Sequence, residues 1–476
     1  MKNLKMDPQL SYKATKLNLL RLDTIPVRAF WISSFAFFLC FFSWFGVIPF
    51  LPEIVNDLGM SPSDKWNATV LAVTGTVFAR LVIGKLSDRY GPRLCYTGLL
   101  LLGSVPVILT GFAQTPAQFL ICRFFTGFIG ASFVITQVHT SLMFATNVVG
   151  TANATSAGWG NLGGGANRLG MPVFAGLILA LGVSEAVVWR YSIVMAGCLC
   201  LLMGVVYYFF TKDTPAGNFN ELPEQHIPRH KKDQVSWIEV IKDYRVWILF
   251  CVYACCFGIE LTVYGTMDDY LQTTFHLDRI TAGHIVLSFA LMNLFARTLG
   301  GFLSDRLGTN RGLRGRVLFL AIVLLAEGLC LAIFSGIESF PIAILALILF
   351  SLAVQMAEGA TFSVVPFISQ KAIGTVSGLV GAGGNVGAFL AALLMKYKSG
   401  SAETNAIIAN QGLSDEVMNA AQTAAASHAM SEGYLLIGGA VVVTGILATA
   451  IRFSPVEEHK MQKEIQRSMT FQQDRA

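Results

Sequence analysis

The sequence predicts an all-α polytopic membrane protein with twelve transmembrane helices in two six-helix halves. Three observations support this prediction. Of the 476 residues, 54% are hydrophobic and only 13% are charged, whereas soluble domains carry about 25% charged residues. Apolar runs of about 20 residues, each long enough to cross a bilayer, recur along the chain. In addition, motifs from the first half of the chain return in the second half.

The predicted crossings divide the chain into two bundles and a linker. They lie at about 29–51, 66–86, 94–113, 117–138, 153–182, 191–211, 245–267, 280–304, 316–335, 341–366, 374–397 and 431–453. Residues 29–211 would form the N-terminal bundle and residues 245–453 the C-terminal bundle. Residues 212–244 nearly balance five Lys/Arg with six acidic side chains around three prolines, which favours a linker. The stretch 399–430 lacks a sustained apolar face, so we expect a loop there.

The distribution of basic residues predicts the orientation. Of the 34 Lys and Arg, 25 fall on one side of the predicted crossings, five on the other and four inside them. The positive-inside rule assigns the richer side to the cytoplasm. We therefore expect the N-terminal segment 1–28 and the tail 454–476 to be cytoplasmic, in a multi-pass protein of a plasma membrane or bacterial inner membrane. Basic residues that gather at helix ends do not indicate nucleic-acid binding.

Several motifs of the first half are repeated in the second. Phe78-Ala79-Arg80 returns 217 residues later as Phe295-Ala296-Arg297. Both are followed, at the same spacing, by the pattern Gly-x-Leu-Ser-Asp-Arg-x-Gly. Gly160-Asn161-Leu162-Gly163 is matched by Gly384-Asn385-Val386-Gly387. Parallel repeats of this kind are typical of transporters that place a site between two rocking halves.

The repeated Asp-Arg pairs, Asp88-Arg89 and Asp305-Arg306, follow crossings two and eight. The sequence around the first pair resembles the loop signature of the major facilitator superfamily. An aspartate there can cap a neighbouring helix or pair with an arginine across the cytoplasmic closure. We predict that these four residues form a cytoplasmic gate whose contacts break when the site opens inward.

Two arginines are predicted near the middle of the bilayer. Arg80 lies eight residues before Asp88, about 12 Å along a helix, and Arg297 occupies the matching depth. A charge there costs at least about 2.5–3.5 kcal/mol, so each arginine needs a partner. No Asp or Glu of crossings one, two, four, five, eight or eleven lies at that depth. The planar guanidinium groups therefore favour a small oxyanion as the counter-ion, and pairing with a buried acid is the structural alternative.

Asn161 and Asn385 lie at a similar depth in crossings five and eleven. An amide can donate to an oxyanion without adding charge, so both are candidate substrate-binding residues. The glycines around them are expected to let crossing five approach crossing eight, and crossing eleven approach crossing two. These packing glycines are Gly160, Gly163, Gly164, Gly384 and Gly387. Packing alone would explain the glycines but not the two asparagines.

No motif indicates a cofactor, a metal site or an enzyme. Gly158, Gly160 and Gly163 match the spacing of a dinucleotide-binding fingerprint. The match is rejected because it lies within a membrane-length apolar helix that no strand precedes. We therefore predict no cofactor and no catalytic or metal-binding residues.

The segments 158–165 and 381–387 resemble the two signature motifs of the nitrate/nitrite porter family of the major facilitator superfamily, and the likeness extends from Ser33 to Arg452. The resemblance implies the major facilitator fold and transport of nitrate, with nitrite as a second candidate, by alternating access. It implies that Arg80, Arg297 and Asn161 bind the anion. Tyr253 and Phe257 resemble the aromatic walls of the site, and ordinary packing is the alternative for that pair.

The coupling mode stays open at this point. Moving one anion into a negative interior costs about 2.3 kcal/mol per 100 mV, so uptake needs proton cotransport or exchange for another anion. Glu260 and Glu358 are candidate proton carriers, or else structural acids. The expected partners are nitrate or nitrite, protons in the case of symport, and the lipid bilayer. The sequence does not indicate whether an accessory protein is needed, and a non-transporting nitrate sensor is a less favoured alternative.

Two residues depart from the family pattern. His139, near the cytoplasmic end of crossing four, is interpreted as a hydrogen-bonded structural histidine rather than a proton carrier. Arg168 lies seven residues after Asn161 on nearly the same helix face. It either attracts anions into the outer vestibule, or it extends toward the lipid headgroups or pairs with a nearby acid.

Overall fold

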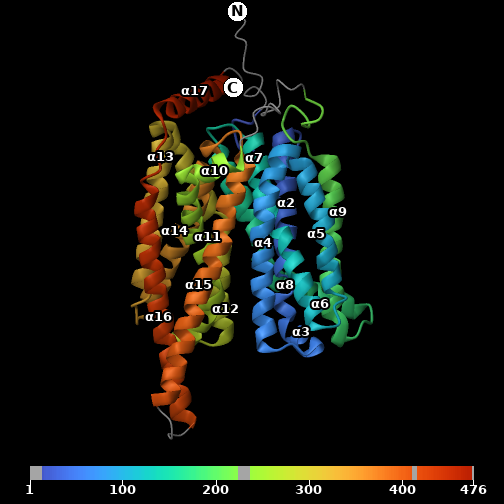
Figure 1. Cartoon of the computed structure of the whole chain (residues 1–476), viewed down its shortest axis with the longest axis vertical. Coiled ribbons are helices and arrows are strands. Elements are labelled where there is room, and N and C mark those ends of the chain that lie inside the picture. The colour runs from blue at the N-terminus through green and yellow to red at the C-terminus, as the bar shows by residue number, and fades with distance from the viewer. Residues whose placement is uncertain (1–12, 223–235, 410–414, 474–476) are drawn as a thin grey trace, which may run out of the picture.

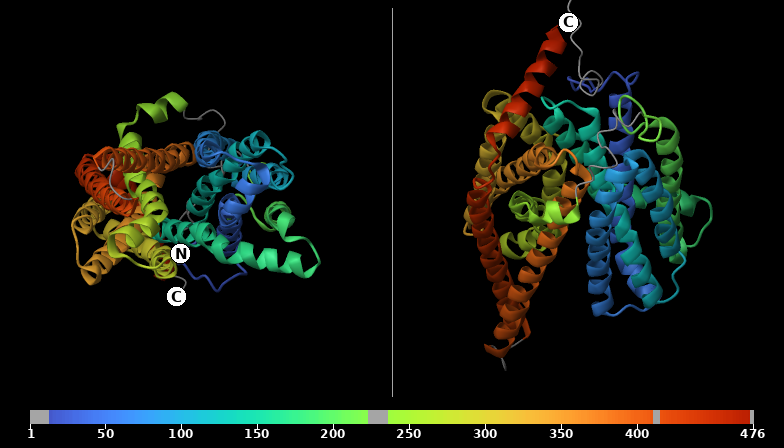
Figure 2. Two further views of the ribbon diagram at one scale, coloured as in Figure 1. Left: turned by 90° about the horizontal axis from the view of Figure 1, so that it is seen from below. Right: turned by 45° about the horizontal axis from the view of Figure 1, so that its top comes forward.

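The computed structural model of the protein describes residues 13–222, 236–409 and 415–473. Within these ranges it contains helices and connecting turns, and no β-strand. The helices form two bundles that stand side by side along their length (Figure 1). The view along the bundles shows the N-terminal helices on one side and the C-terminal helices on the other (Figure 2).

The N-terminal bundle is built from long helices, two of which have short interruptions. It comprises α2 (Ile25–Phe45), η1 (Ile48–Phe50), α3 (Leu51–Leu58), α4 (Pro62–Tyr90), α5 (Pro92–Thr110), α6 (Pro116–Thr126), η2 (Gly127–Ala131), α7 (Ser132–Met143), α8 (Val149–Ala180), η3 (Glu185–Val187) and α9 (Val188–Phe210).

The C-terminal bundle follows the linker and ends in a helix outside the bundle. It comprises α10 (Trp237–Lys242), α11 (Tyr244–Phe275), α12 (Arg279–Leu291), η6 (Met292–Leu294), α13 (Ala296–Phe334), α14 (Phe340–Ile368), α15 (Ile373–Ala409), α16 (Asp415–Ala448) and α17 (Pro455–Gln473). Across the halves, α4 packs against α15, and α8 packs against α13 and α14.

The twelve predicted crossings can be assigned to these helices. Ten helical stretches among the described residues are long and apolar enough to cross a membrane. One of them, Ile280–Phe334, contains 55 residues and two crossings, because Gly312 turns the chain inside α13 at φ 69°. α8 is 32 residues long and lies outside those ten. It packs along α2 and α13 as crossing five.

Local sequence signals explain where α4, the helix that carries Arg80, begins and ends. The Ser61 hydroxyl accepts from the backbone N–H of Asp64, and the Asp64 carboxylate accepts from the backbone N–H of Ser61. This reciprocal pair is a capping box, which satisfies two N–H groups at the helix start. Gly91 ends the helix at φ 87°, a conformation that glycine adopts without a Cβ clash.

The predicted loop at 399–430 is wrong for the described part of that stretch. α15 continues to Ala409 and α16 begins at Asp415, so both helices project beyond the other crossings as a hairpin (Figure 1). The stretch is rich in alanine, the residue with the highest helix propensity. Helix formation there needs no apolar face, and the sequence prediction relied on such a face.

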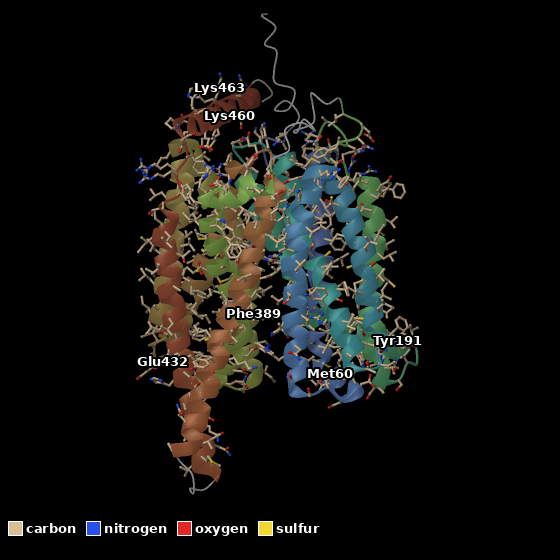
Figure 3. All side chains as sticks on the ribbon, in the orientation of Figure 1. Met60, Tyr191, Phe389, Glu432, Lys460 and Lys463 are labelled. Carbon is tan, nitrogen blue, oxygen red and sulfur yellow. The ribbon has the colours of Figure 1, made fainter. Side chains whose placement is uncertain are left out.

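One end of the molecule carries α17, and we call it the α17 end. Lys460 and Lys463 lie there, whereas Met60 and Glu432 lie towards the opposite end (Figure 3). Glu458 of α17 accepts from the backbone N–H groups of Leu313 and Arg314 at 2.9 and 3.0 Å. The predicted tail 454–476 is therefore mainly a helix docked on α13. Residues 1–12 of the predicted N-terminal segment and 223–235 of the predicted linker lie outside the described residues.

Candidate functional site

Arg80 is buried in the middle of α4 at the interface between the halves, with 0% of its surface exposed. Its Nε donates to the Gly130 carbonyl of the same half at 3.2 Å. Its Nη1 donates to the Gly381 carbonyl of α15, in the other half. Among the described residues, its Nη2 has no hydrogen-bond partner. Arg80 therefore bridges the two halves and keeps one unused donor group.

Arg297 is equally buried, with 1% exposed, but it forms an ion pair with Glu358 of α14. The expectation that no carboxylate balances Arg297 is therefore wrong. The depth comparison covered crossings one, two, four, five, eight and eleven, and Glu358 belongs to crossing ten. Packing of α13 against α14 brings the two side chains together. Sequence spacing alone could not reveal this pairing, because 61 residues separate the partners.

The two candidate asparagines have different surroundings. The amide of Asn161, on α8, faces the guanidinium of Arg297 across the halves, oriented so that its oxygen accepts. Asn385, on α15, is fully buried. Neither its amide oxygen nor its amide nitrogen has a partner in the described part of the chain. Asn385 is thus a buried amide whose donors and acceptor are all unused.

Tyr253 and Phe257 line this region from α11 as a stacked pair, with ring centroids 5.3 Å apart and planes 4° apart. Phe133 of α7 also stacks with Tyr253, with ring centroids 5.6 Å apart. The Arg80 guanidinium lies over Phe133 and Phe257, at 5.2 and 5.7 Å from the ring centroids. Tyr253 is thus near Arg80 and also near Arg297. Phe133 was not among the sequence candidates, although Gly130-Ala131-Ser132-Phe133 has a counterpart in Gly359-Ala360-Thr361-Phe362 of the second half.

The packing glycines of α8 have a different neighbour from the one expected. A Cβ at Gly160 or Gly163 would collide with Phe37 or the Phe38 carbonyl of α2, and Gly164 faces Phe45. They therefore pack crossing five against crossing one, not against crossing eight. The contact with crossing eight is made by Gly158, where a Cβ would lie 2.4 Å from the Asn293 carbonyl oxygen.

The packing glycines of α15 also face their own half. A Cβ at Gly384 would collide with the rings of Tyr253 and Phe257, and one at Gly387 would collide with the Ala254 backbone. Crossing eleven is thus packed against crossing seven at these positions. The expected approach to crossing two occurs instead at Gly378, where a Cβ would lie 2.4 Å from the Arg80 carbonyl oxygen.

Glu260, on α11, is the other acid near the two arginines. Its carboxylate accepts from the Asn293 amide at 2.6 Å, and both side chains are buried. Glu260 also interacts electrostatically with Arg297. The two candidate proton carriers therefore surround the same arginine, Glu358 by direct contact and Glu260 at longer range.

The two gate aspartates cap helices of the opposite half. The Asp88 carboxylate accepts from the backbone N–H groups of Gly374 and Thr375, at 2.7 and 2.9 Å, at the start of α15. The Asp305 carboxylate accepts from those of Gly150 and Thr151, at 3.1 and 2.6 Å, at the start of α8. Negative charge at a helix N-terminus is favoured by the unsatisfied N–H groups and the helix dipole. Both contacts lie at the α17 end and hold the halves together there.

The arginines that follow these aspartates do not reach the gate. Arg89 and Arg306 are exposed, and Arg89 lies over the ring of its neighbour Tyr90. Arg316 is a basic partner at the gate, and it donates to Asp305 at 2.5 Å and to the Thr146 carbonyl at 2.9 Å. The prediction of Arg89 and Arg306 as gate residues is therefore wrong. Residues one apart on a helix point about 100° apart, so the arginine cannot share the aspartate's direction.

The two departures from the family pattern are both hydrogen-bonded or paired. His139 is buried, and its Nε2 donates to the Lys212 carbonyl at 2.7 Å, which leaves Nδ1 to accept from Tyr207 Oη at 2.5 Å. Arg168 is partly exposed and pairs with Asp268 of α11 at 3.7 Å. The Arg168–Asp268 pair joins the halves nearer the end opposite α17.

Together these residues form a buried centre suited to a small anion. Two guanidinium groups and two amides supply donors, and an aromatic stack supplies flat apolar walls. No cluster of three His, Cys, Asp or Glu side chains that could hold a metal ion occurs among the described residues. Two six-helix halves, a cationic centre between them and a closure that both halves share define a membrane transporter of the alternating-access type.

Comparisons with known proteins agree with that class. The sequence model of the Major Facilitator Superfamily matches residues 33–392. The solved proton:xylose symporter XylE has a similar fold, with a TM-score of 0.59 at 12% identity over 90% of this chain and 94% of that one. "High affinity nitrate transporter 2.5" of Arabidopsis thaliana is 41% identical over 80% of this chain and 76% of its own length.

"Nitrate/nitrite transporter NrtP" of Picosynechococcus is 30% identical, over 76% of this chain and 83% of its own length. The chain belongs to the major facilitator superfamily, in the branch that contains these transporters. The predicted fold class is confirmed, and the family is one of secondary transporters rather than enzymes.

Proposed function

We propose that this protein carries nitrate across a cell membrane, with nitrite as a second substrate, and that the anion binds between Arg80 and Arg297. The observation that carries the proposal is the set of buried, unused donors at this centre, which includes Arg80 Nη2 and the Asn385 amide. Leaving such a group without a partner costs about 1–3 kcal/mol. A planar oxyanion would satisfy these donors, and the names of the relatives support nitrate as that anion.

The α17 end is assigned to the cytoplasm in this proposal. The basic residues concentrate on the side of the chain that contains α17 and the linker, as the positive-inside rule requires of cytoplasmic segments. The Asp88 and Asp305 caps would then close the cytoplasmic side. The single, longer ion pair between Arg168 and Asp268 would lie on the exterior side.

We further propose that Glu358 couples nitrate to protons. In the described structure Glu358 occupies Arg297, so an incoming anion must compete with the carboxylate. A proton on Glu358 removes that competition, because the neutral acid no longer balances the guanidinium. Nitrate and a proton would therefore bind together, and the charge around Arg297 would stay nearly constant.

The same contact favours symport over exchange. A carrier whose binding cations are unbalanced when empty cannot easily return across the membrane without substrate, because buried unpaired charges are costly. Glu358 balances Arg297 in the absence of substrate. One of the two binding cations is therefore already balanced when the protein is empty, which lowers the cost of the return without substrate that net uptake requires and obligatory exchange does not.

The test uses the full-length protein in proteoliposomes with labelled nitrate or nitrite. An imposed inward proton gradient should drive accumulation of nitrate without any anion inside. Accumulation that needs internal nitrite and ignores the proton gradient would replace symport by exchange. No saturable uptake of either anion by correctly folded protein would refute the proposed function.

A further inference from the structure

Glu327, on the second part of α13, is a buried carboxyl group that the site described above does not use. Its exposed fraction is 0%. Neither of its carboxyl oxygens has a hydrogen-bond partner within the described residues. It lies eleven residues after Arg316, about 16 Å along a helix, and half the hydrocarbon core is about 15 Å thick. The group is therefore near the middle of crossing nine.

No positive charge compensates this carboxyl among its electrostatic neighbours. These are Glu260 of α11, the thiols of Cys255 and Cys256 on the same helix, and Cys330 on α13. The one carboxyl group among these neighbours is a second acid, Glu260, and the others are thiols.

In the described part of the chain, the contacts of the other helices at this level also involve no cation. α16 packs so tightly here that a Cβ on Gly328 would lie 2.6 Å from the Gly438 carbonyl oxygen and 2.8 Å from a Val442 methyl. α14 reaches this layer through Thr361, whose hydroxyl lies 4.0 Å from Cys256 Sγ. Glu358, the acid of α14, is held by Arg297.

From this geometry we propose that Glu327 is a proton-binding site, occupied in the conformation described here and emptied when the halves open towards the cytoplasm. An ionised carboxylate with no donor in a dry interior is far costlier than a neutral carboxyl. Here the group is a carboxylic acid. Loss of its proton requires water or a donor to enter between α11, α13 and α16, so the step needs a rearrangement of these helices.

The inference rests on the proposed transport function and adds a second transported proton to each cycle. If Glu358 takes one proton per nitrate, the loaded centre carries the same charge as the empty one, and that step moves no net charge. A second proton carried on Glu327 would make each cycle move one net positive charge inward. The membrane potential would then drive uptake. The proton binds to a carboxylate oxygen from the outer solution and leaves from the same oxygen to the cytoplasmic solution, with no other bond changed.

The first test needs no transport. Infrared spectroscopy of the purified full-length protein at neutral pH should show the C=O stretch of a protonated carboxyl. That band should disappear in Glu327→Gln. It should persist in the matched control Glu338→Gln, which removes an exposed carboxyl after the same helix. A wild-type spectrum in which Glu327 contributes only carboxylate bands would overturn the proposal, whatever the variants do.

The second test measures coupling in proteoliposomes. Because Gln imitates the neutral acid, Glu327→Gln should keep nitrate–nitrate counterflow and lose the inward-positive current, with nitrate accumulation driven by voltage falling about tenfold. An unchanged current in this variant would reduce Glu327 to a structural acid. If wild-type protein carries no nitrate at all, the proposed function fails, and the infrared test still decides whether the proton site exists.

Discussion

A buried arginine needs a hydrogen-bonding or charged partner, and the two arginines of this site have partners of different kinds. Arg80 donates to two backbone carbonyls and lies between aromatic rings, so its charge is not neutralised by an acid. Arg297 has a full carboxylate partner in Glu358. Because only Arg297 is neutralised without substrate, the two positions are chemically unequal even though their motifs repeat.

Replacing either arginine by lysine keeps the charge but removes the planar fork. We expect Arg80→Lys and Arg297→Lys each to weaken nitrate binding about tenfold or more, because an ammonium offers no bidentate geometry. Isothermal titration of purified protein with nitrate measures this directly. Arg89→Lys, at an exposed position, is the control. Near-normal affinity in either buried variant would remove that arginine from the site.

Glu358→Gln should preserve nitrate binding and remove the dependence of that binding on protons. Without the competing carboxylate, Arg297 is free at every pH, so nitrate affinity should become nearly independent of pH. Wild-type affinity should fall as pH rises, because ionised Glu358 then occupies Arg297. Titrations across the pH range check the slope. A variant as pH-dependent as the wild type would place the coupling proton elsewhere.

The sequence predicted the residues of the centre better than their contacts. Arg80, Arg297 and Asn161 were recognisable because charged and amide groups stand out within apolar helices. The Glu358 partner was missed because helix packing, not spacing, brings crossings eight and ten together. Glu327 could have been noticed, since it is a lone acid in an otherwise apolar run.

Helices of one half are capped at their N-termini by residues of the other half. The first turn of α15 is capped by Asp88, and that of α8 is capped by Asp305. The sequence suggested capping or ion pairing for these aspartates without choosing between them. The structure shows capping at both, and at Asp305 it adds an ion pair with Arg316.

Asp88→Asn and Asp305→Asn should loosen the α17 end by different amounts. An asparagine loses the charge at the helix N-terminus, an effect of about 0.3–1 kcal/mol at exposed sites and up to about 2 when partly buried. At position 305 it also deprives Arg316 of its partner, so we expect the larger effect there. Hydrogen–deuterium exchange at the first turns of α8 and α15 measures the change, with Arg306→Gln as the control. Equal protection in both variants and the wild type would show that the caps do not hold the closure.

At the scale of the whole molecule, the composition and the internal repeat were sufficient to predict the fold. The length of the apolar runs predicts the membrane crossings, and the repeated motifs predict that the crossings form two halves. What composition could not predict was the α15–α16 hairpin, because helix propensity acts there without an apolar pattern, and the docking of α17 through Glu458.

The two ends of the molecule are closed to different degrees. At the end opposite α17, Arg168 and Asp268 approach to 3.7 Å with about a third of each side chain exposed, 38% and 31%. Exposed pairs contribute at most about 1 kcal/mol.

If Arg168 attracts anions, we expect Arg168→Gln to raise the apparent Michaelis constant for nitrate at low ionic strength. If Arg168 only holds the two halves together through its ion pair, Asp268→Asn should have the same effect as Arg168→Gln. Uptake measured at low and high salt for both variants distinguishes these roles.

The reciprocal caps at the starts of α8 and α15 also affect the leakage of water and protons through the protein. Each half provides one carboxylate and one helix start, so a rotation of the halves breaks both contacts at once and leaves no stage at which one seal is open and the other shut. Opening is then all-or-none. Until both contacts break, the α17 end stays closed to water, and this closure would keep protons from leaking inward and dissipating the gradient that the proposed symport uses.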